Sequence, residues 1–396
     1  MENTLLVDKH VLLYLEMRDE DLPFIITDFC GVTEYSLRTD YQGITIYFCG
    51  NVELVEHIPN VIIIGDFCYN NSSTTHKVIS WQQVPRNVNN VGMFVDRCFE
   101  PGYYDRICAD HEFQNLTESN KPSNAFRTGV YVTDVAEINN GTHFHLLRCS
   151  SNFSGPTCGK EQSDMEIMET VNNYSEKFYK QSVDMNHALI QKYNNNTDTG
   201  KKAAIKQHSD KTKDMPANGL LAFCTFYNDD DITEQQTTKM RFKLKSDVEG
   251  DYIEKFDVVF TPNSLFIISL HMNRLYTHEI IPGQLEAAKL PTRIGYVLRA
   301  STTLAIWRDN KTYIIKDCNE NELIEPYDEG VNRLKDIYYQ ENMTSNKVTY
   351  EGFDFSLNKG DYTKPNIGGN KSDSLTVQSI FGHSKSISLF STDLNL

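Results

Sequence analysis

The sequence has 396 residues, 39% of them hydrophobic, and a formal net charge of −16. This composition is too apolar for a disordered chain, and at ~100–200 residues per domain the length suits two domains or one elaborated domain. The acidic balance argues against broad, nonspecific binding of nucleic acid, although a local basic path to a site is compatible with it.

Cysteine usage and the N-terminus indicate the compartment. The nine Cys residues include no CxxC pair, which excludes the usual disulfide frameworks and structural zinc sites. Asp8, Lys9 and His10 interrupt the first apolar stretch, so it makes a poor signal peptide. No run approaches the ~18 apolar residues of a membrane helix. We therefore expect an intracellular protein, cytoplasmic or nuclear, with reduced thiols and no membrane partner.

The first 150 residues are predicted to be rich in strands. Short apolar or β-branched runs, split by Gly, Asn and Asp, predict strands at 11–17, 22–29, 43–48, 61–67 and 76–81. His143 and His145 could form a metal pair, but two such residues are more often ordinary polar side chains on one face of a strand. The region is expected to be a separate domain, or an elaboration that forms a lid over a following core.

Residues 163–185 carry a helical pattern. Met168, Val171 and Phe178 recur at helical spacing with Glu and Lys between them, which predicts an amphipathic helix lying on a sheet. Ser163, followed three residues later by Glu166, can form a capping box at the helix start.

Short strands return after this helix. They are predicted at 187–193, 204–208, 220–227, 240–245, 256–260, 264–270, 276–281 and 293–299. About eight closely spaced strands after one helix predict a barrel or a double-sheet jelly roll, in a chain that is α+β but mainly β. The tail is predicted to hold a helix near 330–340 and a flexible stretch at 368–373. We expect an N-terminal region at 1–150, a core at 151–318 and a C-terminal extension at 319–396.

One histidine of eleven has an aspartate two residues later: His208 and Asp210. On a strand, such residues point to the same face. His278, in a predicted strand 70 residues on, could supply a third ligand. Two His and one carboxylate suit a non-haem Fe(II) site, because they leave metal positions open for co-substrate and O₂. The alternative is a solvent-facing loop histidine and an ordinary half-buried one.

Two arginines bracket a predicted core strand. Arg293 and Arg299 are six residues apart, so both point to one face, and burial there is unfavourable without anionic partners. A dicarboxylate co-substrate could supply the anions, since a guanidinium binds a carboxylate through two hydrogen bonds. The alternative is a pair of ion pairs with carboxylates of the protein.

The ordered set of HxD, a distant His and then RxxxxxR resembles the AlkB-like branch of the Fe(II)/2-oxoglutarate-dependent dioxygenases. Residues 188–193 look like the strand whose Asn-x-Tyr helps hold 2-oxoglutarate, and 263–268 are similar to the run before the distal His. The resemblance covers roughly residues 165–305. It implies a double-stranded β-helix (a jelly-roll or cupin-like core) with flanking helices, and hydroxylation or oxidative demethylation using Fe(II), 2-oxoglutarate and O₂.

The resemblance also assigns roles. Arg293 would bind the distal carboxylate of 2-oxoglutarate, Arg299 would lie near its metal-bound end, and Tyr193 would donate to it. Two positions depart from the family pattern: Gln191 stands in place of the Asn before x-Tyr, and Gly295 in place of the Asn inside RxxxxxR. Both departures put the affinity for 2-oxoglutarate in question.

The expected substrate is a nucleic-acid base, unstacked or single-stranded. Lysines around the HxD pair could follow a phosphate backbone, with Lys211 and Lys213 closest to it. The same lysines could equally form a solvated face, and the acidic net charge favours a protein side chain or small metabolite as substrate. A further alternative is a non-catalytic jelly-roll binding module whose two arginines hold another anion.

Overall fold

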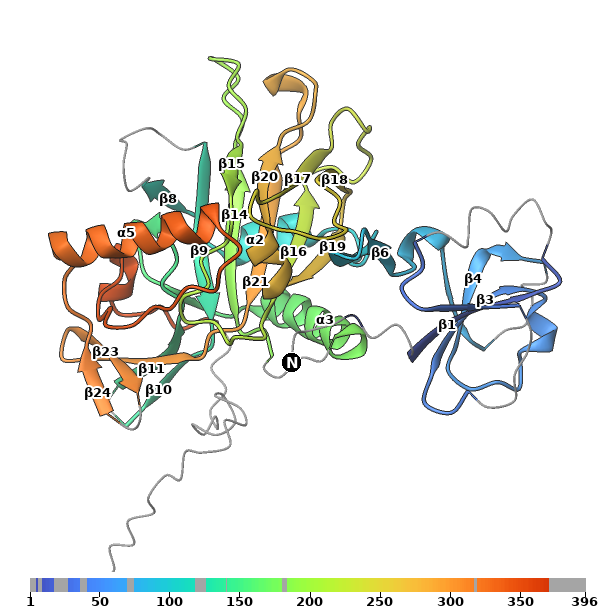
Figure 1. Cartoon of the computed structure of the whole chain (residues 1–396), viewed down its shortest axis with the longest axis horizontal. Coiled ribbons are helices and arrows are strands. Elements are labelled where there is room, and N and C mark those ends of the chain that lie inside the picture. The colour runs from blue at the N-terminus through green and yellow to red at the C-terminus, as the bar shows by residue number, and fades with distance from the viewer. Residues whose placement is uncertain are drawn as a thin grey trace, which may run out of the picture.

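The chain is a β-rich α+β protein with several antiparallel sheets (Figure 1). None of the described helices is long and apolar enough to cross a membrane. The predicted strand at 22–29 and the predicted flexible stretch at 368–373 lie largely outside the described residues. The computed structural model describes residue 5 and residues 9–17, 28–35, 41–69, 75–117, 126–139, 141–179, 184–316 and 319–369.

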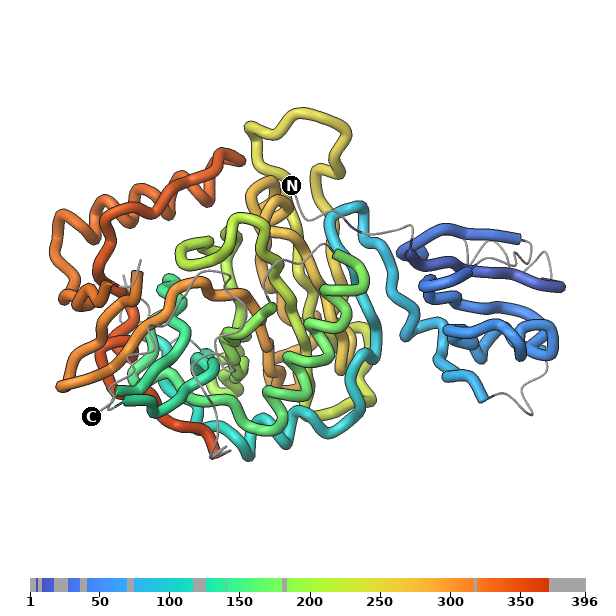
Figure 2. Tube along the Cα trace, turned by 90° about the horizontal axis from the view of Figure 1, so that it is seen from below, coloured from blue at the N-terminus to red at the C-terminus, as the bar shows by residue number. Residues whose placement is uncertain are grey.

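The N-terminal strands form their own parallel sheet, in the order β2-β1-β3-β4-β5. Its strands are β1 (His10–Leu15), β2 (Val32–Glu34), β3 (Thr45–Gly50), β4 (Val61–Cys68) and β5 (Lys77–Ile79). Apolar clusters cover both faces, as expected for a parallel sheet. The sheet lies to one side of the remaining chain (Figure 2), and the His10 ring stacks on Phe178 with ring centres 3.8 Å apart.

A ten-stranded sheet forms the centre of the molecule, in the order β12-β8-β9-β14-β21-β16-β19-β7-β6, with β13 beside β9. Its strands are β6 (Arg86–Val88), β7 (Gly92–Val95), β8 (Gln114–Thr117), β9 (Arg127–Thr133), β12 (Asn152–Phe153), β13 (Cys158–Gly159), β14 (His187–Tyr193), β16 (Leu220–Tyr227), β19 (Ser264–Ser269) and β21 (Arg293–Arg299). The predicted strands at 187–193, 220–227 and 293–299 are confirmed. The predicted boundary at residue 150 is not, because β7 pairs with β19 and β9 with β14, so strands from both sides of it share one sheet.

A four-stranded antiparallel sheet, β15-β20-β17-β18, faces the central sheet. Its strands are β15 (Ile205–His208), β17 (Thr238–Leu244), β18 (Lys255–Phe260) and β20 (Tyr276–Ile281). One apolar cluster joins the two sheets, with Phe223 and Phe266 from the central sheet packed near Phe242 and Ile280 from the smaller one. The space between these sheets holds the candidate site.

A further sheet, β10-β11-β22-β23-β24, crosses the other predicted boundary, at residue 318. Its strands are β10 (Val135–Ile138), β11 (Gly141–Leu146), β22 (Thr303–Arg308), β23 (Lys311–Lys316) and β24 (Asn319–Glu322). Because β23 pairs with β24, the chain after 318 continues this sheet before it forms the C-terminal helix.

Helices cover the outer face of the central sheet and one end of the molecule. They are α2 (Tyr103–Asp110), α3 (Gln162–Phe178), α4 (Leu270–Leu275) and α5 (Asp328–Met343), with short 3-10 segments at Val52–Leu54, Trp81–Gln83, Ala287–Lys289 and Lys359–Tyr362. The apolar stripe of α3 packs on the central sheet, as predicted.

The predicted capping box of α3 is wrong by two residues. Glu161 is the N-cap, and its backbone N–H donates to the Asp164 carboxylate at 2.8 Å. Ser163 is buried inside the first turn, and Glu166 instead accepts from Tyr103 and Arg106. The helix therefore begins where Glu161 and Asp164 form the capping box.

Candidate metal centre

The structure brings His208, Asp210 and His278 together, as predicted. His208 is the last residue of β15 and is directly paired with His278 of β20. The ligand atoms of all three residues lie within 4.8 Å of one another, and within the described part of the chain they form the one such cluster. β15 ends at His208, as the predicted strand does, and Asp210 belongs to the following loop, so the alternation of side chains on a strand does not explain why the two lie together.

Neighbouring groups orient two of the three ligands, whereas His278 Nδ1 is buried with no hydrogen-bond partner in the described structure. His208 Nδ1 lies 2.8 Å from the Lys206 carbonyl oxygen, which only accepts, so Nδ1 carries the proton and Nε2 keeps its lone pair. Asp210 Oδ2 accepts from Arg299 Nη2 at 2.8 Å. Asp210 Oδ1 is left facing the imidazoles, 3.6 Å from His208 Nε2 and 4.0 Å from His278 Nε2.

The local electrostatics favour the forms that bind a metal. Burial, with His208 adding to it, lowers the pKa of His278 to about 3 and keeps that imidazole neutral. Burial alone would raise the pKa of Asp210, but Arg299 and the two histidines hold it well below its usual range. A neutral His278 imidazole and an ionised Asp210 carboxylate are ready to bind a divalent cation without first losing protons.

Amide and carboxylate side chains hold the loop that carries Asp210. Asn273 of α4 accepts from the Asp210 N–H and donates to its carbonyl, both at 2.9 Å. Asn342 of α5 accepts from the Ser209 N–H at 2.9 Å, and Glu341 accepts from the Thr212 N–H at 3.1 Å. Sequence reasoning missed these residues, because a lone Asn or Glu 63 to 133 residues away from the loop carries no local signal.

The two arginines of β21 lie on the inner face of the central sheet and differ in their partners. Arg299 forms an ion pair with Asp210. For Arg299, the structure therefore shows the alternative prediction, an ion pair with a carboxylate of the protein. Arg293 is 3% exposed and lies over the Tyr193 ring, 3.9 Å from its centre. Its Nη2 is buried with no hydrogen-bond partner in the described structure. Arg293 is therefore the arginine that lacks an anion.

The side chains around Arg293 explain why glycine occupies position 295, one of the two positions that differ from the dioxygenase motifs. Gln191 and Gly295 are directly paired, and the Tyr193 hydroxyl donates to Gln191 Oε1 at 3.4 Å. A Cβ at Gly295 would lie 3.0 Å from Arg293 Nη1 and 3.1 Å from Tyr193 Cε2. The glycine thus leaves room for the stacked Arg293 and Tyr193 side chains.

Thr225 is a polar residue of this face that sequence reasoning missed. It is paired with Gly295 across the strands, and its buried Oγ1 has no hydrogen-bond partner in the described structure. The sequence could have indicated this residue. Thr225 is two residues after Phe223 in an otherwise apolar strand, so both side chains point to the inner face.

Lys211 and Lys213, which were predicted to follow a phosphate backbone, are not on the surface. Lys211 and Lys213 are both buried, with their ammonium groups donating to the carbonyls of Tyr338 and Phe355 in the C-terminal extension. Burial lowers the pKa of Lys211 to about 8 and that of Lys213 to about 7. Sequence periodicity could not show that a segment more than 120 residues away covers these side chains.

His143 and His145 lie on β11 outside the metal cluster, and His145 contacts Asn186 instead. No known protein-family model matches the chain, and no curated protein matches it either.

Proposed function

We propose that this protein is an Fe(II)- and 2-oxoglutarate-dependent dioxygenase that oxidises a C–H bond, by hydroxylation or oxidative demethylation. The observation that carries the proposal is the combination of two His and one carboxylate within 4.8 Å and a buried arginine without an anion on the adjoining inner face. Such a ligand set, with open metal positions, is typical of non-haem Fe(II) oxygenases.

The strand order supports a double-stranded β-helix as the core. From β14 to β21, the chain alternates between the central sheet (β14-β21-β16-β19) and the four-stranded sheet (β15-β20-β17-β18), with one hairpin, β17–β18, inside the smaller sheet. This winding is what a jelly roll built from eight strands requires. It also explains why residues far apart in sequence, such as His208 and His278, become neighbours.

The side chains between the sheets fit 2-oxoglutarate. Arg293 Nη2 and Thr225 Oγ1 are donors buried without acceptors, and a bound carboxylate would satisfy both. Arg293 would hold the distal carboxylate, assisted by Tyr193, and the Gln191 amide would lie beside it. His208, Asp210 and His278 would hold Fe(II).

The bound metal and 2-oxoglutarate would supply the activation of O₂ for C–H oxidation. The chain's own residues orient and protect the site. Arg299 directs Asp210 Oδ1 toward the histidines, and the Phe223 and Phe242 rings, each 5.7 Å from the His278 ring, keep water from that ligand. His208 is half-exposed and so marks the side from which a substrate would approach.

Anaerobic calorimetric titration of 2-oxoglutarate into Mn(II)-loaded protein tests the proposal. We expect metal-dependent binding in the wild type that is lost in His208→Ala and in Arg293→Ala. Arg241→Ala is the matched control, because Arg241 pairs with Asp257 at the surface of the smaller sheet. A folded wild type that binds no 2-oxoglutarate, or an Arg293→Ala variant with unchanged affinity, would contradict the proposal.

The family resemblance implies a nucleic-acid base as the substrate, and a protein side chain or small metabolite is the second candidate. The net charge of −16 and the burial of Lys211 and Lys213 favour the second class. Oxygen-dependent succinate formation, measured with a methylated single-stranded oligonucleotide beside a peptide and metabolite panel, separates the two. Binding of 2-oxoglutarate with no succinate from any substrate would instead indicate a binding module.

A further inference from the structure

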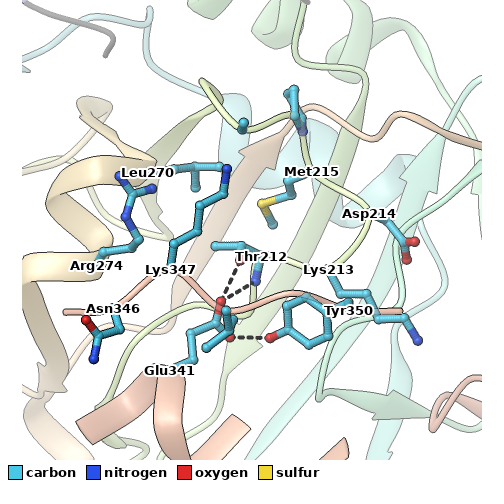
Figure 3. Close-up of a pocket in the computed structure, with 13 residues that line it drawn as sticks. Thr212, Lys213, Asp214, Met215, Leu270, Arg274, Glu341, Asn346, Lys347 and Tyr350 are labelled. Carbon is cyan, nitrogen blue, oxygen red and sulfur yellow. Dashed lines mark hydrogen bonds between the residues drawn. The ribbon is translucent and has the colours of Figure 1, made fainter. Parts of the chain in front are cut away.

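A cavity of about 220 Å³ lies between the loop after Asp210 and the C-terminal extension. Residues 212–217 form one wall, continuing directly from the metal-ligand loop, while Leu270 and Arg274 of α4 and the chain from Glu341 to Tyr350 form the others. Figure 3 shows Arg274 and Lys347 on one side of the cavity and Glu341 on the other. None of the residues that line it is a metal ligand or one of the residues proposed to hold 2-oxoglutarate.

Two cations at the cavity have no anionic partner. In the part of the chain that the structure describes, no carboxylate lies within ion-pair distance of Arg274 or Lys347. Arg274 Nη2 instead contacts His271 Nδ1, at 3.2 Å. The cavity lining therefore holds two cations without an ion-pair partner among the described residues, beside the carboxylates of Asp214 and Glu341, and its potential depends on whether those carboxylates are balanced by other cations.

The acidic residues of the wall are already engaged. Glu341 accepts from the Thr212 hydroxyl at 2.5 Å and from Tyr350, as the dashed lines in Figure 3 show. Asp214 forms a bidentate ion pair with Arg148, with contacts of 2.9 and 2.6 Å. Arg148 balances the charge of Asp214, and Lys211, 3.9 Å from the Glu341 carboxylate, balances that of Glu341, so the charges of Arg274 and Lys347 remain.

Two buried lysines lie behind the wall, close to Glu341. Lys245 donates to the Glu341 carbonyl at 2.7 Å, and Lys211 lies 3.9 Å from the Glu341 carboxylate. Burial, followed by the charge of Lys211, lowers the pKa of Lys245 to about 8, and Arg274 contributes in the same direction.

The remaining lining is apolar. Met215, Pro216, Leu270 and Val348 lie around the cavity, so a ligand with only charged groups would leave this surface in contact with water. The volume is below the ~300–1,000 Å³ of pockets for drug-sized ligands, which limits the occupant to a small molecule or a single group of a larger one.

We propose that this cavity is a second binding site, which takes a phosphate monoester whose phosphate contacts Arg274 and Lys347 and whose small apolar group lies against Met215 and Leu270. A phosphate monoester carries a charge of about −1.5 to −2 near pH 7, which matches two unpaired cations. The arginine fork and the amide of Asn346 supply donors in addition to charge.

Calorimetric titration of the full-length, metal-free protein with phenyl phosphate tests this site. Metal and 2-oxoglutarate are left out, so the result does not depend on the proposed dioxygenase function. Arg274→Gln and Lys347→Gln are each expected to weaken binding at least about tenfold, the loss of one charge-assisted contact. Lys335→Gln, on the exposed face of α5 and away from the cavity, is the matched control and should bind as the wild type does.

Inorganic phosphate and phenol separate the contributions of charge and apolar surface. Weaker binding of inorganic phosphate and no binding of phenol would support the full proposal, and equal binding of both phosphates would support the anion site and assign it to free phosphate. No saturable binding of either phosphate, or equal loss in all three variants, would overturn the site. Because Lys347 is exposed, a folding defect cannot account for its effect.

Discussion

The replacement Asn273→Ala tests how the metal-ligand loop is held. The Asn273 side chain is 0% exposed and makes both of its hydrogen bonds to the main chain of Asp210. Alanine would leave one buried N–H and one buried carbonyl without partners. Each such group costs about 1–3 kcal/mol, so we expect the free energy of unfolding to fall by about 2–6 kcal/mol.

The same change should weaken metal binding. Asp210 would no longer be held in position relative to His208 and His278, and groups that orient metal ligands commonly contribute about 10–100-fold in affinity. We expect Mn(II) to bind at least about tenfold more weakly to Asn273→Ala, measured by titration at a temperature where the variant is folded. Asn273→Asp should give an intermediate result, because it can still accept from the Asp210 N–H but cannot donate to the carbonyl.

Asn172→Ala is a matched control. Asn172 makes the same pair of bonds to the main chain of Met185, at 2.9 and 3.1 Å, on the outer side of the central sheet. The Asn172→Ala variant should have a lower free energy of unfolding in denaturant titrations and an unchanged affinity for Mn(II). A folded Asn273→Ala protein that binds Mn(II) as tightly as the wild type would refute the reasoning.

Three further changes have clear expected outcomes. Arg148→Ala leaves the Asp214 carboxylate buried and unpaired, and should lower the free energy of unfolding by about 3–5 kcal/mol in urea titrations. Burial lowers the pKa of Lys213 from 10.5 to about 7, so between these pH values the unfolded side chain keeps a proton that the folded one releases. The free energy of unfolding therefore rises with pH in this range. Lys213→Met should reduce that rise, measured by denaturant unfolding from pH 7 to 10. Gly295→Ala should weaken 2-oxoglutarate binding in calorimetry, because its Cβ would displace Arg293, while unchanged affinity would show that the stack with Tyr193 is not needed.

Several features of the site were predictable from local sequence pattern. The alternation of side chains on a strand placed Arg293 and Arg299 on one face, and β14, β16, β20 and β21 begin and end where their apolar runs do. The spacing of His208 and Asp210 indicated two residues of the metal cluster, and the ordered set of HxD, a distant His and RxxxxxR added His278. These inferences succeed because each depends on the chemistry and periodicity of a few neighbouring residues.

Only the tertiary structure determined which residues and strands contact one another. It made Arg299 the partner of Asp210 rather than of a co-substrate, and it buried Lys211 and Lys213 beneath the C-terminal extension. It also joined β7 and β9 to strands more than 50 residues later in the chain, across the expected domain boundary. Hydrophobic periodicity specifies which face of an element is buried, whereas the identity of the neighbour follows from strand register and packing between distant segments, which no local pattern encodes.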